Sequence, residues 1–114
     1  MPQVLVIDDE SFILDLLQSI LIQFGYDVKV ACDGREGIEV FETEHDLDLV
    51  ITDIRMPWMD GNAVARHIRN SDRSDIPIIA ISAFTDKFED ELFNSFIKKP
   101  FNIQTLADVL ETLK

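Results

Sequence analysis

Carboxylates, a hydroxyl and an ammonium group stand directly after short apolar stretches of this sequence. Asp8 follows the run VLVI and precedes a second acidic residue, Asp9, whereas Asp53 follows the run LVIT. Ser82 follows IIAI, and Lys99 follows FIK. Several carboxylates together can bind a divalent cation, and a hydroxyl and an ammonium group can hold the oxygens of a phosphoryl group. The pattern therefore predicts a cation-assisted phosphoryl site, provided that the fold brings these side chains together.

Hydrophobic periodicity predicts an alternation of strands and helices. Short apolar runs predict strands, and apolar residues repeated every three or four positions predict the helices that follow them. The expected strands are 4–7, a stretch around 28–30, 49–51, 76–81 and 96–97. The expected helices are 11–24, a short one opened by Asp33-Gly34, 63–68, and a final one after a cap at Asn102. In the first helix the residues expected to repeat along the inner face are Ile13, Leu16, Leu17, Ile20 and Phe24. Five strand–helix repeats imply an α/β fold with a mostly parallel sheet and helices on both faces.

The polar residues of the first paragraph all fall at the carboxyl ends of the predicted strands. In such a sheet, ligands bind outside these ends, where the strand order reverses. Three carboxylates within about 5 Å of one another would repel by roughly 3 kcal/mol per pair at an effective dielectric constant near 20. A divalent cation would remove this repulsion, and oxygen ligands shared with phosphate are typical of Mg²⁺. We therefore expect a magnesium site at this rim.

Length and charge restrict the class of protein. A chain of 114 residues with 46% hydrophobic content can form one domain with its own core. The net charge of −12 argues against direct binding to nucleic acid or to anionic membranes. The only cysteine, Cys32, cannot pair within the chain and is expected to be a reduced, semi-buried thiol. With no export or membrane-spanning segment in view, we expect a cytoplasmic protein.

Four motifs stand in order at the predicted strand ends: VLVIDDE, DIRMPWMDG, AISA and KKPF. Together they resemble the receiver domain of two-component response regulators over nearly the whole chain, although each motif alone is weak. The resemblance implies that residues 1–114 form a single receiver domain with a doubly wound, flavodoxin-like fold and strand order 2-1-3-4-5. It also implies a signalling switch rather than a turnover enzyme. Such a domain accepts a phosphoryl group from a phosphohistidine on a histidine kinase or a histidine phosphotransfer protein and then changes an output surface.

The resemblance assigns the phosphoacceptor and the metal ligands position by position. Asp53 is the phosphoacceptor, and its carboxylate is the nucleophile. Asp9 binds Mg²⁺ directly, Asp8 binds it largely through water, and the backbone carbonyl of Arg55 completes the protein ligands together with Asp53. Mn²⁺ is the alternative cation.

The same resemblance names residues that bind the phosphoryl group, transmit the signal and set its lifetime. Lys99 pairs with the phosphoryl oxygens, and Ser82 moves to hydrogen-bond them. The aromatic residue that responds on the last strand is Phe96, at a position where tyrosine is common in the family. Arg55 and Phe84 lie two positions beyond Asp53 and Ser82 and are expected to tune the lifetime of the phosphoryl group. Because both are bulky, slow hydrolysis is predicted.

One departure from the family concerns the segment between Ser82 and Lys99. It is shorter than usual by more than one helical turn, and Leu92 and Phe93 stand where a small-residue turn is common. We predict that the fourth helix is shortened and that the output uses another surface.

Three other functions have to be weighed against a phosphorylated receiver. A phosphatase with an aspartate nucleophile needs an acid–base aspartate two residues after it, where Arg55 stands. A flavin-binding protein of the same architecture needs a phosphate loop after the first strand, where DDES would repel phosphate. The third, an unphosphorylated interaction module or pseudo-receiver, stays open, although the complete set of polar residues argues against it.

Overall fold

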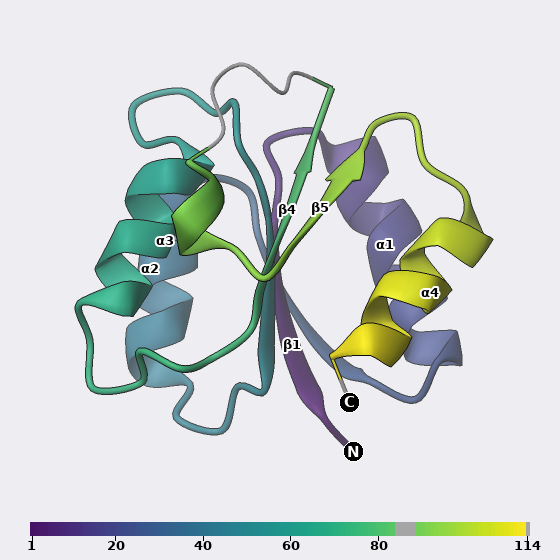
Figure 1. Ribbon diagram of the computed structural model, residues 1–114, viewed down its shortest axis with the longest axis horizontal. Coiled ribbons are helices and arrows are strands. Elements are labelled where there is room, and N and C mark those ends of the chain that lie inside the picture. The colour runs from purple at the N-terminus through teal and green to yellow at the C-terminus, as the bar shows by residue number, and fades with distance from the viewer. Residues whose placement is uncertain (84–88, 114) are drawn as a thin grey trace.

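The computed structural model describes residues 1–83 and 89–113. Its centre is a five-stranded sheet of parallel strands in the order β2-β1-β3-β4-β5 (Figure 1). The strands are β1 (Gln3–Ile7), β2 (Asp27–Ala31), β3 (Leu49–Asp53), β4 (Ile78–Ser82) and β5 (Ser95–Lys98). The predicted fold class and strand order are therefore confirmed. The reversal of strand order between β1 and β3 places a crevice at the carboxyl ends of these two strands.

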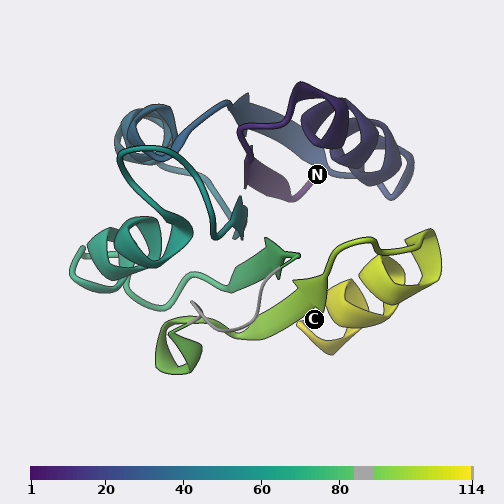
Figure 2. The same ribbon diagram turned by 90° about the horizontal axis from the view of Figure 1, so that it is seen from above.

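Four α-helices cover the two faces of the sheet in pairs, as Figure 1 and the view from above in Figure 2 show. The pair on one face is α1 (Ser11–Gln23) with α4 (Ile103–Thr112), and the pair on the other is α2 (Gly34–Thr43) with α3 (Gly61–Arg69). Each pair closes its own hydrophobic cluster, and the strand residues alternate between the two clusters. β1 contributes Val4 and Val6 to one face and Leu5 and Ile7 to the other.

The starts of three helices are fixed by side-chain caps. The side chains of Asp33, Asp60 and Asn102 accept hydrogen bonds from the backbone N–H groups of Glu36, Ala63 and Thr105. Each bond satisfies one of the N–H groups that lack a partner in the first turn of a helix. The caps expected at Asp33 and Asn102 are confirmed.

The connection from β4 to β5 differs most from a regular strand–helix repeat. In its described part, 89–94, the helical structure is a single three-residue 3-10 helix, η1 (Asp90–Leu92). Over residues 89–94 the predicted shortening of the fourth helix is confirmed, and α4 is the last helix among the described residues. The guanidinium of Arg69 in α3 holds this connection by donating to Leu92 O at 3.0 Å and to Asn94 Oδ1 at 2.9 Å.

Several predicted details of burial are wrong. Leu16 is 38% exposed and Phe24 is 40% exposed, because the buried face of α1 is formed by Leu14, Leu17, Ile20 and Leu21. Cys32 is exposed rather than semi-buried. The fourth strand begins at Ile78 rather than Ile76, after Pro77, which has no N–H to donate to a neighbouring strand.

Within 1–83 and 89–113, no helix is both long and apolar enough to cross a membrane.

Candidate functional site

The ends of four neighbouring strands bring the predicted site residues to one rim of the sheet. Asp53 is the last residue of β3, and Ser82 is the last residue of β4. Asp8 directly follows β1, and its N–H donates to Ala31 O at 3.2 Å. Lys99 directly follows β5, and its N–H donates to Ser82 O at 2.9 Å. These backbone bonds extend the sheet by one residue, so the side chains that carry the chemistry stand on a rigid support.

A glycine lets the chain pass closely behind Asp53. Gly61 opens α3, and its N–H donates to Ile54 O at 2.8 Å. A Cβ at this position would lie 2.2 Å from the backbone oxygen of Asp53, a distance that no side chain tolerates. The glycine thus allows the first turn of α3 to pack against the strand end that presents the Asp53 carboxylate.

Lys99 lies among three carboxylates. Its Nζ is 2.9 Å from Asp8 Oδ2, 3.0 Å from Glu10 Oε1 and 3.6 Å from Asp53 Oδ2. The carboxylates of Asp8, Glu10 and Asp53 each offer an oxygen within 4.8 Å of the other two. Backbone N–H groups hold two of them, because Glu10 N donates to Asp8 Oδ1 and Ile54 N donates to Asp53 Oδ1, both at 2.9 Å. One ammonium group therefore neutralises only part of the negative charge that the rim collects.

Burial dominates the electrostatics of this cluster. It raises the pKa of Asp53 to about 6, and the neighbouring charge of Asp8 adds to the rise, although Lys99 opposes it. Burial likewise raises the pKa of Asp8 above its ordinary value, against the hydrogen bonds from Glu10 N and Lys99. For Lys99, burial alone would lower the pKa, but the hydrogen bonds to Asp8 and Glu10 and the charge of Asp53 raise it overall. The carboxylates thus carry an electrostatic cost that a further cation would relieve.

A small open pocket of about 240 Å³ adjoins the cluster. Its lining residues are Asp9, Glu10, Asp53, Arg55, Ser82, Ala83 and Lys99. Asp53 is 6% exposed and Ser82 is fully buried, so both residues line the pocket while exposing little of their surface to water. The pocket offers a negative edge, a hydroxyl and an ammonium group to one small ligand.

The structure brings most of the predicted site residues together. Asp9 and Arg55 are exposed and line the pocket. Asp9 does not belong to the close group of carboxylates formed by Asp8, Glu10 and Asp53. Phe96 is half-buried on β5 opposite Ala80, and strand alternation places it on the same side of the sheet as Ser82. Phe84 lies outside the described residues.

One member of the cluster, Glu10, was not among the predicted site residues. The acidic run DDE was visible in the sequence. The contact of its third member with Lys99, 89 positions away, depends on the direction in which α1 leaves the rim. Periodicity does not fix that direction.

The donors at the rim fit a hard divalent cation. They are oxygen atoms of carboxylates, two of them on the buried residues Asp8 and Asp53. Mg²⁺ and Mn²⁺ prefer oxygen ligands, and Mg²⁺ retains several waters, which suits an open pocket. The raised pKa values of Asp8 and Asp53 also favour a cation site, because an added positive charge would stabilise both ionised carboxylates.

Comparison with known proteins identifies the family. A family model described as the response regulator receiver domain matches residues 4–111. The chain belongs to this family. The receiver domain is 38% identical over 114 residues to a probable transcriptional regulator, ycf27, of Cyanidium caldarium, with 96% of this chain and 45% of the relative covered. It thus spans about half the length of the curated relatives that it matches.

Solved structures resemble this receiver domain over its whole length. The chemotaxis protein CheY4 of Vibrio cholerae gives a TM-score of 0.91 at 28% identity, with 100% of this chain and 99% of that chain covered. The response regulator TrrA of Thermotoga maritima, in complex with Mg²⁺-BeF, also gives a TM-score of 0.91, at 32% identity and with 100% of both chains covered. The family and the fold are therefore established.

Proposed function

We propose that this receiver domain accepts a phosphoryl group on Asp53 from a phosphohistidine of a histidine kinase or histidine phosphotransfer protein. The observation that carries the proposal is the buried Asp53 carboxylate, which lines a small pocket, with Lys99 Nζ 3.6 Å away. The Ile54 N–H holds this carboxylate in place.

The transfer forms one bond and breaks one. An Asp53 carboxylate oxygen attacks the phosphorus, the phosphorus–nitrogen bond of the phosphohistidine breaks, and its electron pair returns to the imidazole nitrogen. Lys99 and the Ser82 hydroxyl donate hydrogen bonds to the phosphoryl oxygens. These donors stabilise the negative charge that gathers on the transferring group.

A divalent cation is expected to take part. The side chains of Asp8, Asp9 and Asp53 and the backbone carbonyl of Arg55 would hold Mg²⁺, or Mn²⁺ in its place, with Glu10 nearby. When bound, the cation supplies positive charge that offsets repulsion between the carboxylates and the incoming phosphoryl oxygens. Arg55 and Phe84 are proposed to set how fast water removes the phosphoryl group.

The signal is proposed to leave the site through β4 and β5. Ser82 moves toward the phosphoryl group, and the space that it leaves is available to Phe96, which lies on the same side of the sheet. An acyl phosphate adds about one negative charge and new acceptor oxygens. A few charge-assisted hydrogen bonds of roughly 1.5 to 3 kcal/mol each can shift an existing equilibrium between two conformations.

An apolar groove beside the pocket is proposed to receive the phosphodonor. It measures about 360 Å³ and shares Glu10, Ala83 and Lys99 with the rim. Its apolar lining comes from the start of α1 and the segment after β5: Phe12, Ile13, Leu16, Pro100 and Phe101. Phe12 is 74% exposed. An exposed phenylalanine in a groove that adjoins the site pocket is suited to anchor a partner helix.

The wider role follows from the relatives. Curated relatives of about twice this length are described as transcriptional regulators. We propose that this domain supplies the phosphorylation-dependent input of a cytoplasmic signalling pathway. The net charge of −12 predicts that residues 1–114 do not themselves contact DNA.

The experiment that tests the proposal is intact-mass spectrometry after incubation with acetyl phosphate and magnesium. We expect one phosphoryl adduct on the wild-type protein, and none on Asp53→Asn or in the presence of a chelator. Asp48→Asn, an exposed aspartate that precedes β3, is the matched control and should form the adduct normally. Absence of a wild-type adduct with acetyl phosphate and also with a phosphorylated histidine phosphotransfer protein would favour a pseudo-receiver.

A further inference from the structure

The three carboxylates around Lys99 differ in how easily they can move. The side chain of Asp8 is 1% exposed and that of Asp53 is 6% exposed, whereas that of Glu10 is 61% exposed. Backbone N–H groups hold Asp8 and Asp53 in place. In the described part of the chain, the Glu10 side chain does not cap α1, although Glu10 occupies the N-cap position. Glu10 is therefore the partner that Lys99 can exchange at the lowest cost.

Lys99 must change partners when a phosphoryl group arrives. An ammonium group has three donors, and in this structure Asp8, Glu10 and Asp53 surround it. Asp53 and Glu10 both line the pocket that the phosphoryl group would enter. A phosphoryl oxygen can reach Lys99 from this side if the Glu10 carboxylate swings out into water.

We propose that Glu10 is a positioning residue that occupies, in the resting domain, the place of the phosphoryl oxygen on Lys99. The inference rests on the proposed function. With acetyl phosphate, an Asp53 oxygen bonds to phosphorus, the bond from phosphorus to the acetyl oxygen breaks, and the electron pair leaves with acetate. A phosphoryl oxygen then takes the hydrogen bond that Glu10 gives up. The Glu10 contact thus keeps Lys99 oriented and also opposes phosphorylation.

Two substitutions separate the contact from the charge. Glu10→Ala removes both, and Glu10→Asp keeps the charge but shortens the side chain by one methylene and withdraws it from Lys99. Both variants should acquire the phosphoryl group faster than the wild type, by about three- to fivefold, because a partly exposed ion pair is worth up to about that factor. Glu39→Ala, which removes an exposed carboxylate from α2, is the matched control and should leave the rate unchanged.

The measurements are the rate of adduct formation by intact mass at saturating magnesium and the affinity for beryllofluoride, a phosphoryl mimic. Trp58, five positions after Asp53 and 87% exposed, is the fluorescence probe to be used for beryllofluoride binding. Both Glu10 variants should bind it about three- to fivefold more tightly, again the factor expected of such an ion pair. A purely structural role of Glu10 would change the melting temperature and leave this affinity unchanged.

The outcomes separate this inference from the proposed function. If neither acetyl phosphate nor beryllofluoride acts on the wild-type protein, the proposed function is wrong and the inference falls with it. If the wild type reacts but Glu10→Ala is no faster, the inference alone is wrong. If Glu10→Ala is faster and Glu10→Asp is not, the effect comes from charge and the positioning role is excluded.

Discussion

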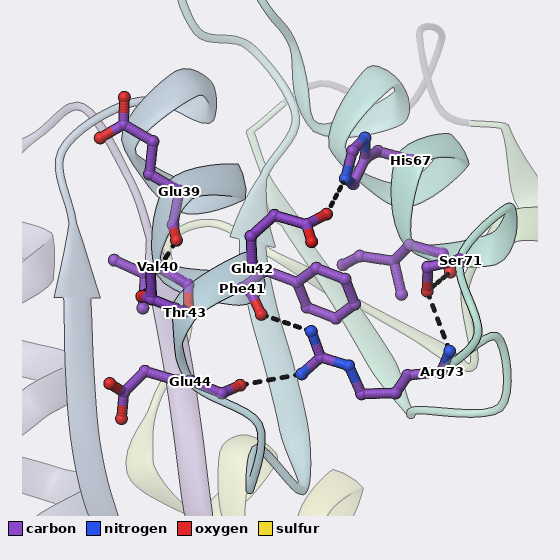
Figure 3. A network of polar contacts seen from close by, with 10 residues as sticks. Glu39, Val40, Phe41, Glu42, Thr43, Glu44, His67, Ser71 and Arg73 are labelled. Carbon is purple, nitrogen blue, oxygen red and sulfur yellow. Dashed lines mark hydrogen bonds and ion pairs between the residues drawn. The ribbon is translucent and has the colours of Figure 1, made fainter.

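Two cationic side chains, Lys99 and Arg73, connect separate elements of this domain, and they do so through different kinds of contact. At the carboxyl ends of the strands, Lys99 faces the carboxylates of Asp8, Glu10 and Asp53. On the face covered by α2 and α3, Arg73 donates to the backbone carbonyls of Phe41 and Glu44 at the end of α2, and its guanidinium lies 3.9 Å from the Phe41 ring centre (Figure 3).

The difference between them lies in charge balance. Arg73 donates to carbonyl groups that lack partners in the last turn of a helix, and it adds a cation–π contact, so its partners are neutral groups. Lys99 leaves a net negative charge at the rim, where burial and then the charge of Asp8 raise the pKa of Asp53. The Arg73 contacts serve stability, whereas the rim keeps an electrostatic cost that ligand binding can relieve.

The largest expected effect is stabilisation by Asp53→Asn in the absence of metal. The pKa of Asp53 is about 6 in the folded domain and near 3.8 when unfolded, so the folded state binds more protons between these values. Stability therefore falls as the pH rises from about 4 to about 6. The variant should be more stable than the wild type by roughly 3 kcal/mol at pH 7 and nearly equal to it near pH 4.

Urea denaturation of both proteins across this pH range checks the prediction. Asp9→Asn, at an exposed position of the same rim, is the control, and it should change the free energy of unfolding by less than about 0.5 kcal/mol. If the difference in free energy of unfolding between wild type and Asp53→Asn did not depend on pH, ionisation of Asp53 would not be the cause of that difference.

Arg73→Ala should have the opposite sign and a somewhat smaller size. It removes two charge-assisted hydrogen bonds and the cation–π contact of a half-buried side chain, for a loss of about 2 kcal/mol. Arg73→Lys keeps the charge but not the planar fork, so about half of the loss should remain. Arg35→Ala, on the exposed side of α2, should be nearly neutral. Loss of less than 0.5 kcal/mol by Arg73→Ala in urea denaturation would contradict the contrast between the two cations.

Magnesium should stabilise the wild-type domain to a smaller extent. At ten times its Kd, a ligand that binds only the folded state adds about 1.4 kcal/mol, which raises the melting temperature of a domain of this size by several degrees. The increase should vanish in Asp8→Asn and persist in Arg73→Ala. The measurement is a thermal melt at constant ionic strength, and a melting temperature indifferent to magnesium would exclude the cation site.

The strands and the rim were predictable because β1, β3, β4 and β5 contain short apolar runs that end on a polar residue or directly precede one. β2 was predictable because Val28 and Val30 alternate with polar neighbours. The side of α1 that faces the sheet was not predictable from the sequence. Its sequence, SFILDLLQSILIQ, carries apolar residues on most of its sides, so periodicity fits more than one inner face. Leu16 and Phe24 were placed inside for this reason, and the sheet instead selects Leu14 and Leu21. The choice depends on packing against β-strands that lie far along the chain.

The site was predictable in its residue types and less so in its pairings. Asp53, Asp8 and Lys99 follow from their positions at strand ends, since parallel strands end at one edge. The contact of Glu10 with Lys99 and the contacts of Arg73 with α2 depend on side chains that cross between elements. Local sequence contains no signal for such contacts, because they form only when the elements have packed.

The smallest expected effect concerns the hydrogen bond between His67 of α3 and Glu42 of α2, which lies close to Arg73 (Figure 3). His67 Nε2 is 2.6 Å from Glu42 Oε1, yet the two side chains are 38% and 55% exposed, so water screens their attraction. Glu42→Gln should therefore cost no more than about 0.5 kcal/mol in urea denaturation. In the double variant with Arg73→Ala, the two losses should add, because the Glu42 carboxylate contacts His67 of α3, whereas Arg73 contacts backbone oxygens of α2 and the Phe41 ring. A coupling energy above about 1 kcal/mol would show instead that the two contacts stabilise the domain cooperatively.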